Sequence, residues 1–250
     1  LSEKPGLPVT DMTGAAHHGS IKAMYVIGEN PIMSEPSLEH ARKAMKNLEF
    51  LVVQDIFPTD TAVMADVILP AAVFAEKDGT FTNTERRVNL VTQVKPPLGD
   101  SKPDLWIFNQ MAKRFDGYEN MNFPDDAAEV FLEIGRLSRG RAAHGGPRYL
   151  DLSGMSHQSI LEARGQQWPL REGENEGAKR LYCDGVFPYP DGKAKLLAMD
   201  WKDNNETPCD DFPFWLNSGR VVEQFHTRTR TGKVGNCNKF SPTAYMEINP

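Results

Sequence analysis

Side chains that could bind a ligand follow directly after an apolar run. Phe50–Val53 is short and rich in β-branched residues, which is typical of a buried strand. Gln54 and Asp55 come next, and Lys77 lies further along, shortly before a run at 83–87 that is dense in hydrogen-bonding groups. Ligands of parallel sheets bind beyond the carboxyl ends of the strands. We therefore predict a binding site at this end of the strand.

A second group of polar residues lies near the other end of the chain. The stretch 220–233 concentrates arginines, a lysine, threonine hydroxyls and a histidine, although the chain has a formal net charge of −6. Arginine and threonine side chains are suited to pyrophosphate and other oxyanions. The alternative interpretation is that this stretch is a solvated basic loop.

Asp104 is a further candidate. It begins a predicted helix, where a carboxylate interacts favourably with free amides.

The elements expected to position the first group form a parallel sheet. Ile21–Ile27 is predicted to be a strand, and the turn from Gly28 to Pro31 leads into a predicted helix over 36–47. Backbone amides of such a turn can hold a phosphate or a nucleoside edge. After the Phe50–Val53 strand, Thr59 is expected to cap a short helix ending at Ala65. Strands joined by such crossovers predict a Rossmann-like sheet, with a further buried strand over Asp66–Leu69 that Pro70 closes.

The rest of the chain is less regular. Apolar spacing predicts helices over 104–115 and 125–138, whereas residues 1–20 look irregular. Strands are expected at Phe212–Leu216 and Ala244–Ile248. His17-His18 invites a metal-site interpretation, but no third ligand lies nearby in the sequence. Cys183, Cys209 and Cys237 form no C-x-x-C pair, which argues against a disulfide framework and against an iron–sulfur or zinc site.

The composition limits the classes of protein to which the chain can belong. The 250 residues are 40% hydrophobic and 25% charged, which is compatible with a packed core. The negative charge argues against a nucleic-acid binder, and no apolar run approaches the roughly 20 residues of a membrane span. The chain begins at Leu1 and not at Met, so we interpret it as a piece of a longer polypeptide, for which a cytoplasmic location is expected.

Three sequence motifs together resemble those of one protein family. They are VVQDIFPTDTAVMADVILPAAVFAEKDGTFTNTERRV, K-P-D-L-W around Asp104, and S-G-R-V-x-x-x-x-H-T-x-x-x-T from Ser218. They resemble the molybdopterin oxidoreductases that carry two molybdopterin guanine dinucleotides, and especially the branch of formate dehydrogenases and nitrate reductases. The resemblance implies an α/β fold: a Rossmann-like parallel sheet domain over 1–117, a helical and irregular connection over 118–210, and the start of a small β-barrel domain over 211–250.

The resemblance also implies a cofactor and its contacts. The cofactor would be a molybdenum or tungsten bis-molybdopterin guanine dinucleotide. The family's [4Fe-4S] cysteines and its metal ligand would lie outside this chain, so no catalytic or metal-ligating residue is expected within it. The positions implied to contact the cofactor are Asn30, Gln54, Asp55, Lys77, Asp104, Ser218, Gly219, Arg220, Val221, Gln224, His226 and Thr227.

The implied function is redox chemistry on a small oxyanion, with an electron-transfer partner. The word R-L-Y-C-D-G-V-F-P-Y-P-D-G-K-A-K favours an assimilatory nitrate reductase. The G-E-N-P turn and A-E-K-D-G-T-F-T-N-T-E-R-R-V are shared with formate dehydrogenases, which form the alternative. Two other classes stay open: the non-catalytic homologue in the large iron–sulfur subunit of NADH dehydrogenase, and a plain nucleotide-binding module. The absence of G-x-G-x-x-G disfavours the latter.

Overall fold

The computed structural model describes residues 4–118, 123–139 and 150–248. Contacts divide the chain into two compact units, Leu1–Pro70 with Trp201–Pro250, and Ala71–Asp200. The three-part division predicted from the sequence follows other bounds and stays a prediction. Among the described residues, no helix is long and apolar enough to cross a membrane.

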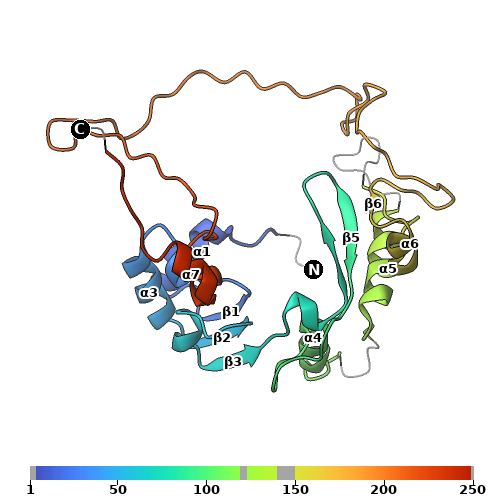
Figure 1. The fold of residues 1–250 in the computed structure, drawn as a ribbon, viewed down its shortest axis with the longest axis horizontal. Coiled ribbons are helices and arrows are strands. Elements are labelled where there is room, and N and C mark those ends of the chain that lie inside the picture. Colours follow the sequence, from blue (N-terminus) through green and yellow to red (C-terminus); the bar gives the residue numbers. More distant parts are fainter. Residues whose placement is uncertain (1–3, 119–122, 140–149, 249–250) are drawn as a thin grey trace. The chain divides into compact units, whose positions relative to one another are not determined.

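The first unit contains a parallel sheet of three strands in the order β1-β2-β3 (Figure 1). The strands are β1 (Ala23–Ile27), β2 (Phe50–Asp55) and β3 (Val67–Pro70). β2 is central, pairing Ile27 with Gln54 on one side and Asp55 with Pro70 on the other. The predicted α/β class and parallel sheet are therefore confirmed, and β2 extends through the two polar residues expected to follow it.

Burial in this sheet differs from the prediction. Leu51 and Val53 are 2% and 0% exposed and form a core with Ile32, Met45 and Ala62. The β3 residues Val67 and Ile68, in contrast, are 38% and 47% exposed. The expectation of a second buried strand is wrong because β3 is the edge of the sheet among the described residues. A short apolar run does not reveal whether both faces of a strand are covered.

In the N-terminal part of the first unit, two helices share a core with this sheet and a third packs on one of them. They are α1 (Val9–His17), α2 (Pro31–Ser34) and α3 (Leu38–Lys46), and the predicted short helix is a 3-10 turn, η1 (Ala62–Met64). The Thr59 hydroxyl accepts from the Ala62 amide at 3.1 Å, but the residue at the N-cap position of this turn is Thr61 and not the predicted Thr59.

The helix α1 replaces an irregular segment that the sequence predicted. The His17 and His40 rings lie 4.8 Å apart, and the Asn47 side chain donates to the His17 carbonyl at 2.8 Å. Ala16 is completely buried. Packing against α3 therefore stabilises a helix that the polar local sequence does not signal.

The second unit contains an antiparallel sheet in the order β4-β5-β6. Its strands are β4 (Gly79–Thr82), β5 (Arg87–Val91) and β6 (Gln166–Gln167), and its helices are η2 (Phe74–Glu76), α4 (Asp104–Ala112), α5 (Ala127–Ser138) and α6 (His157–Glu162). Figure 1 shows α5 and α6 beside the β4–β5 hairpin. The polar run at 83–87, predicted to belong to a ligand site, forms the hairpin turn, where Arg86 has a positive φ of 65°.

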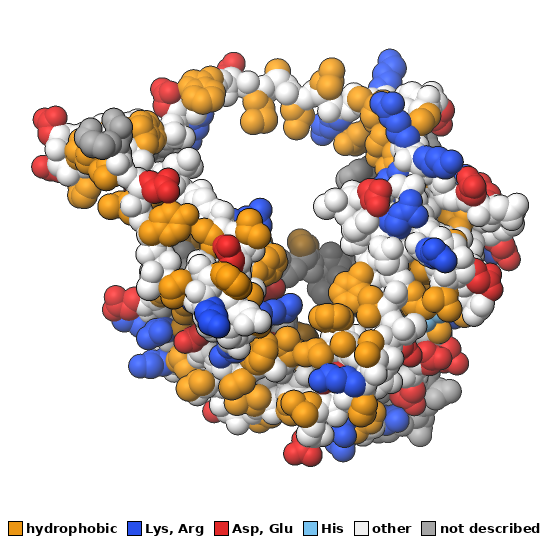
Figure 2. All heavy atoms as spheres, in the orientation of Figure 1, with side chains coloured by type: hydrophobic (Ala, Val, Ile, Leu, Met, Phe, Trp, Pro, Cys, Tyr) orange, Lys and Arg blue, Asp and Glu red, His pale blue; other side chains and the backbone are white. Residues whose placement is uncertain are grey.

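The final part of the chain differs most from expectation. Among residues 211–248 the structure forms a 3-10 turn, η4 (Thr231–Lys233), and a helix, α7 (Gly235–Phe240), and no strand. The strands predicted at 212–216 and 244–248 are therefore wrong, and a β-barrel domain stays a prediction. Phe212 and Leu216 are 76% and 89% exposed, and hydrophobic side chains stand out along 194–216 (Figure 2). A strand needs a neighbour for its backbone groups, and none of the described residues provides one here.

Candidate functional site

The carboxyl ends of β1 and β2 bring the first predicted site residues together. The backbone amide of Gly28, which has a φ of 64°, donates to the Gln54 carbonyl at 2.8 Å. The Gln54 side chain is 1% exposed, and its Oε1 accepts from the Tyr25 hydroxyl on β1. Gln54 therefore bonds within the sheet and fixes the edge from which Asp55 follows.

Asp55 has a buried carboxylate that receives few hydrogen bonds from the protein. Its residue is 9% exposed, and Oδ1 accepts from the Ile56 amide at 2.6 Å. Over the described ranges, no other donor and no ion-pair partner reaches this carboxylate. Four lone-pair positions on two oxygens exceed what one amide can satisfy. The site therefore suits a ligand that presents N–H donors.

Asn30 is 6% exposed and its side-chain amide is engaged within the protein. Oδ1 accepts from the Thr61 amide at 3.2 Å and the Thr61 hydroxyl at 2.8 Å. Nδ2 donates to Thr229 Oγ1 at 3.0 Å and to Asp60 Oδ2 at 3.4 Å. Asn30 thus joins the turn after β1 to a loop 199 positions away. The sequence singled out Asn30 but gave no indication of its partner.

The loop that Asn30 contacts contains Gln224. This residue is 9% exposed, and its Nε2 donates to the Cys237 carbonyl at 3.3 Å, Asn238 Oδ1 at 3.3 Å and the Ser241 carbonyl at 3.0 Å. Its Oε1 is buried and has no partner among the described residues. A buried acceptor without a donor is costly, so this oxygen is a second position suited to a ligand N–H.

The next residues of this loop have unusual backbone conformations. His226 and Arg228 have φ values of 45° and 65°, on either side of Thr227. Arg228 donates to the Pro242 carbonyl at 3.1 Å and to Asn238 Oδ1 at 2.7 Å, which stabilises the turn. Such left-handed residues persist only where their surroundings hold them, and they are frequent at binding sites.

Four predicted residues just before this loop are not brought to it. Ser218, Gly219 and Arg220 are exposed and Val221 is partly buried. No hydrogen bond or ion pair joins any of the four to another residue in the described parts of the chain. Their predicted cofactor contacts stay predictions.

The other two predicted residues lie in the second unit, where they bind each other. Lys77 follows η2 and Asp104 begins α4, and the two form an ion pair with side chains 28% and 29% exposed. The Ala72 amide donates to the Lys102 carbonyl at 2.8 Å, which fixes the approach to Asp104. The expected helix-terminal carboxylate is therefore confirmed in position, with a lysine partner that local sequence could not indicate.

Glu76, next to Lys77, was missed by sequence reasoning. Its side chain is 4% exposed, accepts from the Val73 amide at 3.1 Å and pairs with Lys95 at 3.1 Å. Burial alone would raise the pKa of Glu76, but the Val73 and Leu98 amides and the Lys95 ammonium together lower it below the ordinary value for glutamate. Its only sequence signal is its place beside Lys77.

Arg86 is a second missed residue. Its guanidinium lies over the Trp168 ring at 5.5 Å and donates to the carbonyls of Trp168, Ala178 and Lys179. Arg86 therefore organises the 166–180 segment around the hairpin turn.

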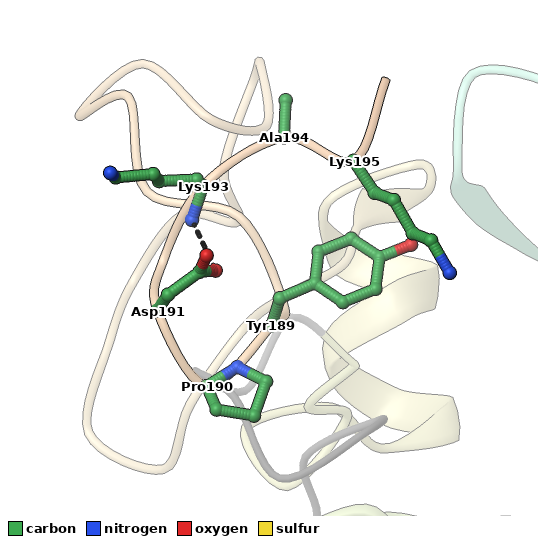
Figure 3. Close-up of a pocket in the computed structure, with 6 residues that line it drawn as sticks. All are labelled: Tyr189, Pro190, Asp191, Lys193, Ala194 and Lys195. Carbon is green, nitrogen blue, oxygen red and sulfur yellow. Dashed lines mark hydrogen bonds between the residues drawn. The ribbon is translucent and has the colours of Figure 1, made fainter. Parts of the chain in front are cut away.

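One open pocket is lined by none of the predicted site residues. Tyr189, Pro190, Asp191, Lys193, Ala194 and Lys195 line it (Figure 3). Asp191 Oδ1 accepts from the Lys193 amide at 3.1 Å, which closes its turn. No grouping of three or more His, Cys, Asp or Glu able to hold a metal occurs in the described residues.

Comparison with known proteins assigns the family. Residues 1–114 match the family model described as molybdopterin oxidoreductase. The chain belongs to the molybdopterin oxidoreductase family. Over all 250 residues it is 37% identical to the F420-dependent formate dehydrogenase subunit alpha of Methanocaldococcus jannaschii, of which it covers 35%. It is 37% identical to a putative formate dehydrogenase of Bacillus subtilis, again over the whole chain but only 24% of that protein.

Two more proteins are similar to this chain. A nitrate reductase of Synechocystis sp. is 35% identical over 249 residues, which are 97% of this chain and 34% of that protein. Acetylene hydratase from Pelobacter acetylenicus has a similar fold, with a TM-score of 0.53 and 22% identity over 74% of this chain and 23% of that structure. The chain thus spans about a third or less of these molybdopterin oxidoreductase relatives.

Proposed function

We propose that this chain holds part of a molybdopterin guanine dinucleotide in a molybdenum or tungsten oxidoreductase. The observation that carries the proposal is the Asp55 carboxylate, which is 9% exposed and accepts from the Ile56 amide alone among the described residues. Guanine presents adjacent N1–H and N2–H₂ donors, which a carboxylate can bind in a bidentate manner. This pairing offsets the cost of burying the charge and discriminates guanine from adenine.

Other residues fit the remaining parts of such a cofactor. Gln224 Oε1 is a buried acceptor suited to an N–H donor, and Lys77 can pair with an anionic oxygen while Asp104 holds its ammonium. Asn30, Gln54, Ser218, Gly219, Arg220, Val221, His226 and Thr227 complete the proposed contacts. When bound, the cofactor supplies two-electron redox chemistry, and the protein groups hold and orient it. The [4Fe-4S] cluster and the metal-ligating residue are proposed to lie outside this chain.

The proposed substrate is a small oxyanion, with electrons exchanged with a partner protein. Formate is the leading candidate, because the two relatives at 37% identity are named formate dehydrogenases. The sequence motifs alone favoured nitrate. Nitrate stays the second candidate because one relative, at 35% identity, is named a nitrate reductase.

Metal and nucleotide analysis of the intact protein tests this proposal. We expect about one molybdenum or tungsten and about two guanine nucleotides per chain after acid release, the stoichiometry of one bis-dinucleotide cofactor. An assay with a viologen dye then separates formate oxidation from nitrate reduction. Folded protein with neither metal nor guanine would instead support the non-catalytic homologue of NADH dehydrogenase.

A further inference from the structure

The orientation of the Asn30 side chain is fixed by its neighbours. Ile32 donates its amide to the Thr61 hydroxyl at 3.3 Å, so the single hydroxyl hydrogen of Thr61 is directed to Asn30 Oδ1 at 2.8 Å. The Thr61 amide also donates to Oδ1, at 3.2 Å. An amide nitrogen cannot accept these bonds. Nδ2 must therefore face the other way, toward Thr229.

This orientation determines what the Thr229 hydroxyl does. Its oxygen accepts from Asn30 Nδ2 at 3.0 Å and lies 3.1 Å from the hydroxyl oxygen of Thr227. A hydroxyl has one hydrogen to donate. With the Asn30 hydrogen pointing at its oxygen, Thr229 can direct its own hydrogen to Thr227. The Thr227 hydrogen is then available to a group outside the protein, and Thr227 is exposed.

We propose that Thr229 is a positioning residue that turns the Thr227 hydroxyl into a donor toward an anionic oxygen of the bound ligand. The chain of bonds runs from the Asn30 amide through Thr229 and Thr227 to that oxygen. Each donor in such a chain polarises the next. This inference rests on the proposed function, and the chemistry it requires is a phosphate oxygen of the dinucleotide. The Asn30 side chain thus contributes to ligand binding through Thr229.

The surrounding loop holds this arrangement in place. The left-handed residues His226 and Arg228 flank Thr227, and Arg228 is fixed by bonds to Asn238 and to the Pro242 carbonyl. The Lys233 ammonium lies 5.8 Å from the centre of the Phe57 ring, a second contact between this loop and the segment that follows β2. The Thr227 hydroxyl is thus held on a constrained turn.

A double-mutant cycle on the intact protein tests the proposal. The variants are Thr227→Val, Thr229→Val and the double variant, and the measured quantity is the rate at which guanine-bearing cofactor leaves the folded protein. Loss of a hydrogen bond to a charged group predicts release about tenfold faster for Thr227→Val. Thr229→Val should approach that rate, and the double variant should match Thr227→Val, because Thr229 acts only through Thr227.

Two further variants separate this role from loop packing. Thr229→Ser keeps the hydroxyl and should release cofactor at the wild-type rate. The Thr231 hydroxyl accepts from the Phe225 amide at 3.1 Å in the same loop, and this bond involves neither Asn30 nor Thr227. The effects of Thr231→Val and Thr227→Val should therefore add. If Thr229→Val does not fold, Thr229→Ala, which introduces no added bulk, takes its place in the cycle.

The outcomes distinguish this inference from the function on which it rests. Wild-type protein without metal and guanine overturns both. A loaded wild type in which Thr229→Val releases cofactor at the wild-type rate overturns the inference alone, as do additive effects of Thr227→Val and Thr229→Val. Faster release with a non-additive double variant and rescue by Thr229→Ser supports it.

Discussion

The carboxylates of Asp55 and Asp104 show two ways of holding a buried or partly buried charge. Asp55 is at the end of a parallel strand, 9% exposed, and receives a hydrogen bond from the next amide in the chain. Asp104 begins a helix, has a side chain 29% exposed and is neutralised by Lys77. Both were expected to contact the same cofactor. The first is arranged to accept donors from a ligand, whereas the second already has a counter-ion.

This difference predicts different consequences of removing each charge. At Asp55 the loss should appear in ligand binding, because the described protein offers little for the carboxylate to bind. At Asp104 the loss should appear first in the stability of the fold, because an ammonium is left without its partner. Substitutions at the two positions therefore test whether Asp55 acts in ligand binding and Asp104 in the stability of the fold.

Asp55→Asn should have the largest effect on cofactor binding. The amide keeps the shape but sets a donor against the guanine donors, and an unsatisfied polar pair costs about 1–3 kcal/mol. We expect folded protein with reduced molybdenum and guanine content, measured by metal analysis and nucleotide release.

Asp66→Asn is the matched control for this substitution. Asp66 Oδ2 accepts from the Leu51 amide at 2.7 Å, which is a bond internal to the same sheet. The asparagine keeps one oxygen that can accept from this amide but replaces a charge-assisted bond with a weaker neutral one. Thermal stability should therefore fall slightly while the folded fraction keeps its cofactor. Full cofactor load and activity in Asp55→Asn would mean that Asp55 serves only to close the strand.

Lys77→Met should lower the free energy of unfolding by about 1–2 kcal/mol, between the values for exposed and buried ion pairs. The cause is the Asp104 carboxylate left without its ammonium. Urea unfolding of the intact protein measures the change. The double variant with Asp104→Asn should be less destabilised than the sum of the two single variants.

The exposed pair of Lys22 and Glu49 provides the comparison for that cycle. Its atoms lie 2.6 Å apart, but the side chains are 69% and 67% exposed. We expect about 0–1 kcal/mol from Lys22→Met, because solvent screens the pair. Equal effects at Lys77 and Lys22 would show that partial burial does not strengthen the Lys77–Asp104 pair.

The smallest expected effect is a pH dependence at Glu76. Its pKa is lowered in the folded protein by the Val73 and Leu98 amides and the Lys95 ammonium, against the opposing effect of burial. A lowered folded-state pKa contributes stability above the unfolded pKa, and this contribution is lost as pH falls through the folded value. Glu76→Gln should therefore flatten the acid side of the stability profile, measured by thermal unfolding below the ordinary pKa of glutamate. Parallel wild-type and variant profiles would contradict this.

The sequence by itself determined the elements whose signals are local. The β-branched runs of β1 and β2, the turn at Gly28 and the apolar stripe of α3 are visible in short windows, and so the parallel sheet could be predicted. The position of Asp55 at the strand end follows from the same windows. The long family words around Asp55 and Lys77 also identified the molybdopterin oxidoreductases before any geometry was known.

Only the tertiary structure decided which residues became partners. Lys77 and Asp104 are 27 positions apart, and Asn30 and Thr229 are 199 apart, so no local window contains either pair. Dependence on tertiary contacts also explains where the sequence predictions were wrong. Burial of β3, helix formation in α1 and the absence of strands over 212–216 depend on what packs against each segment, and packing energy outweighs the weak preferences of the local sequence.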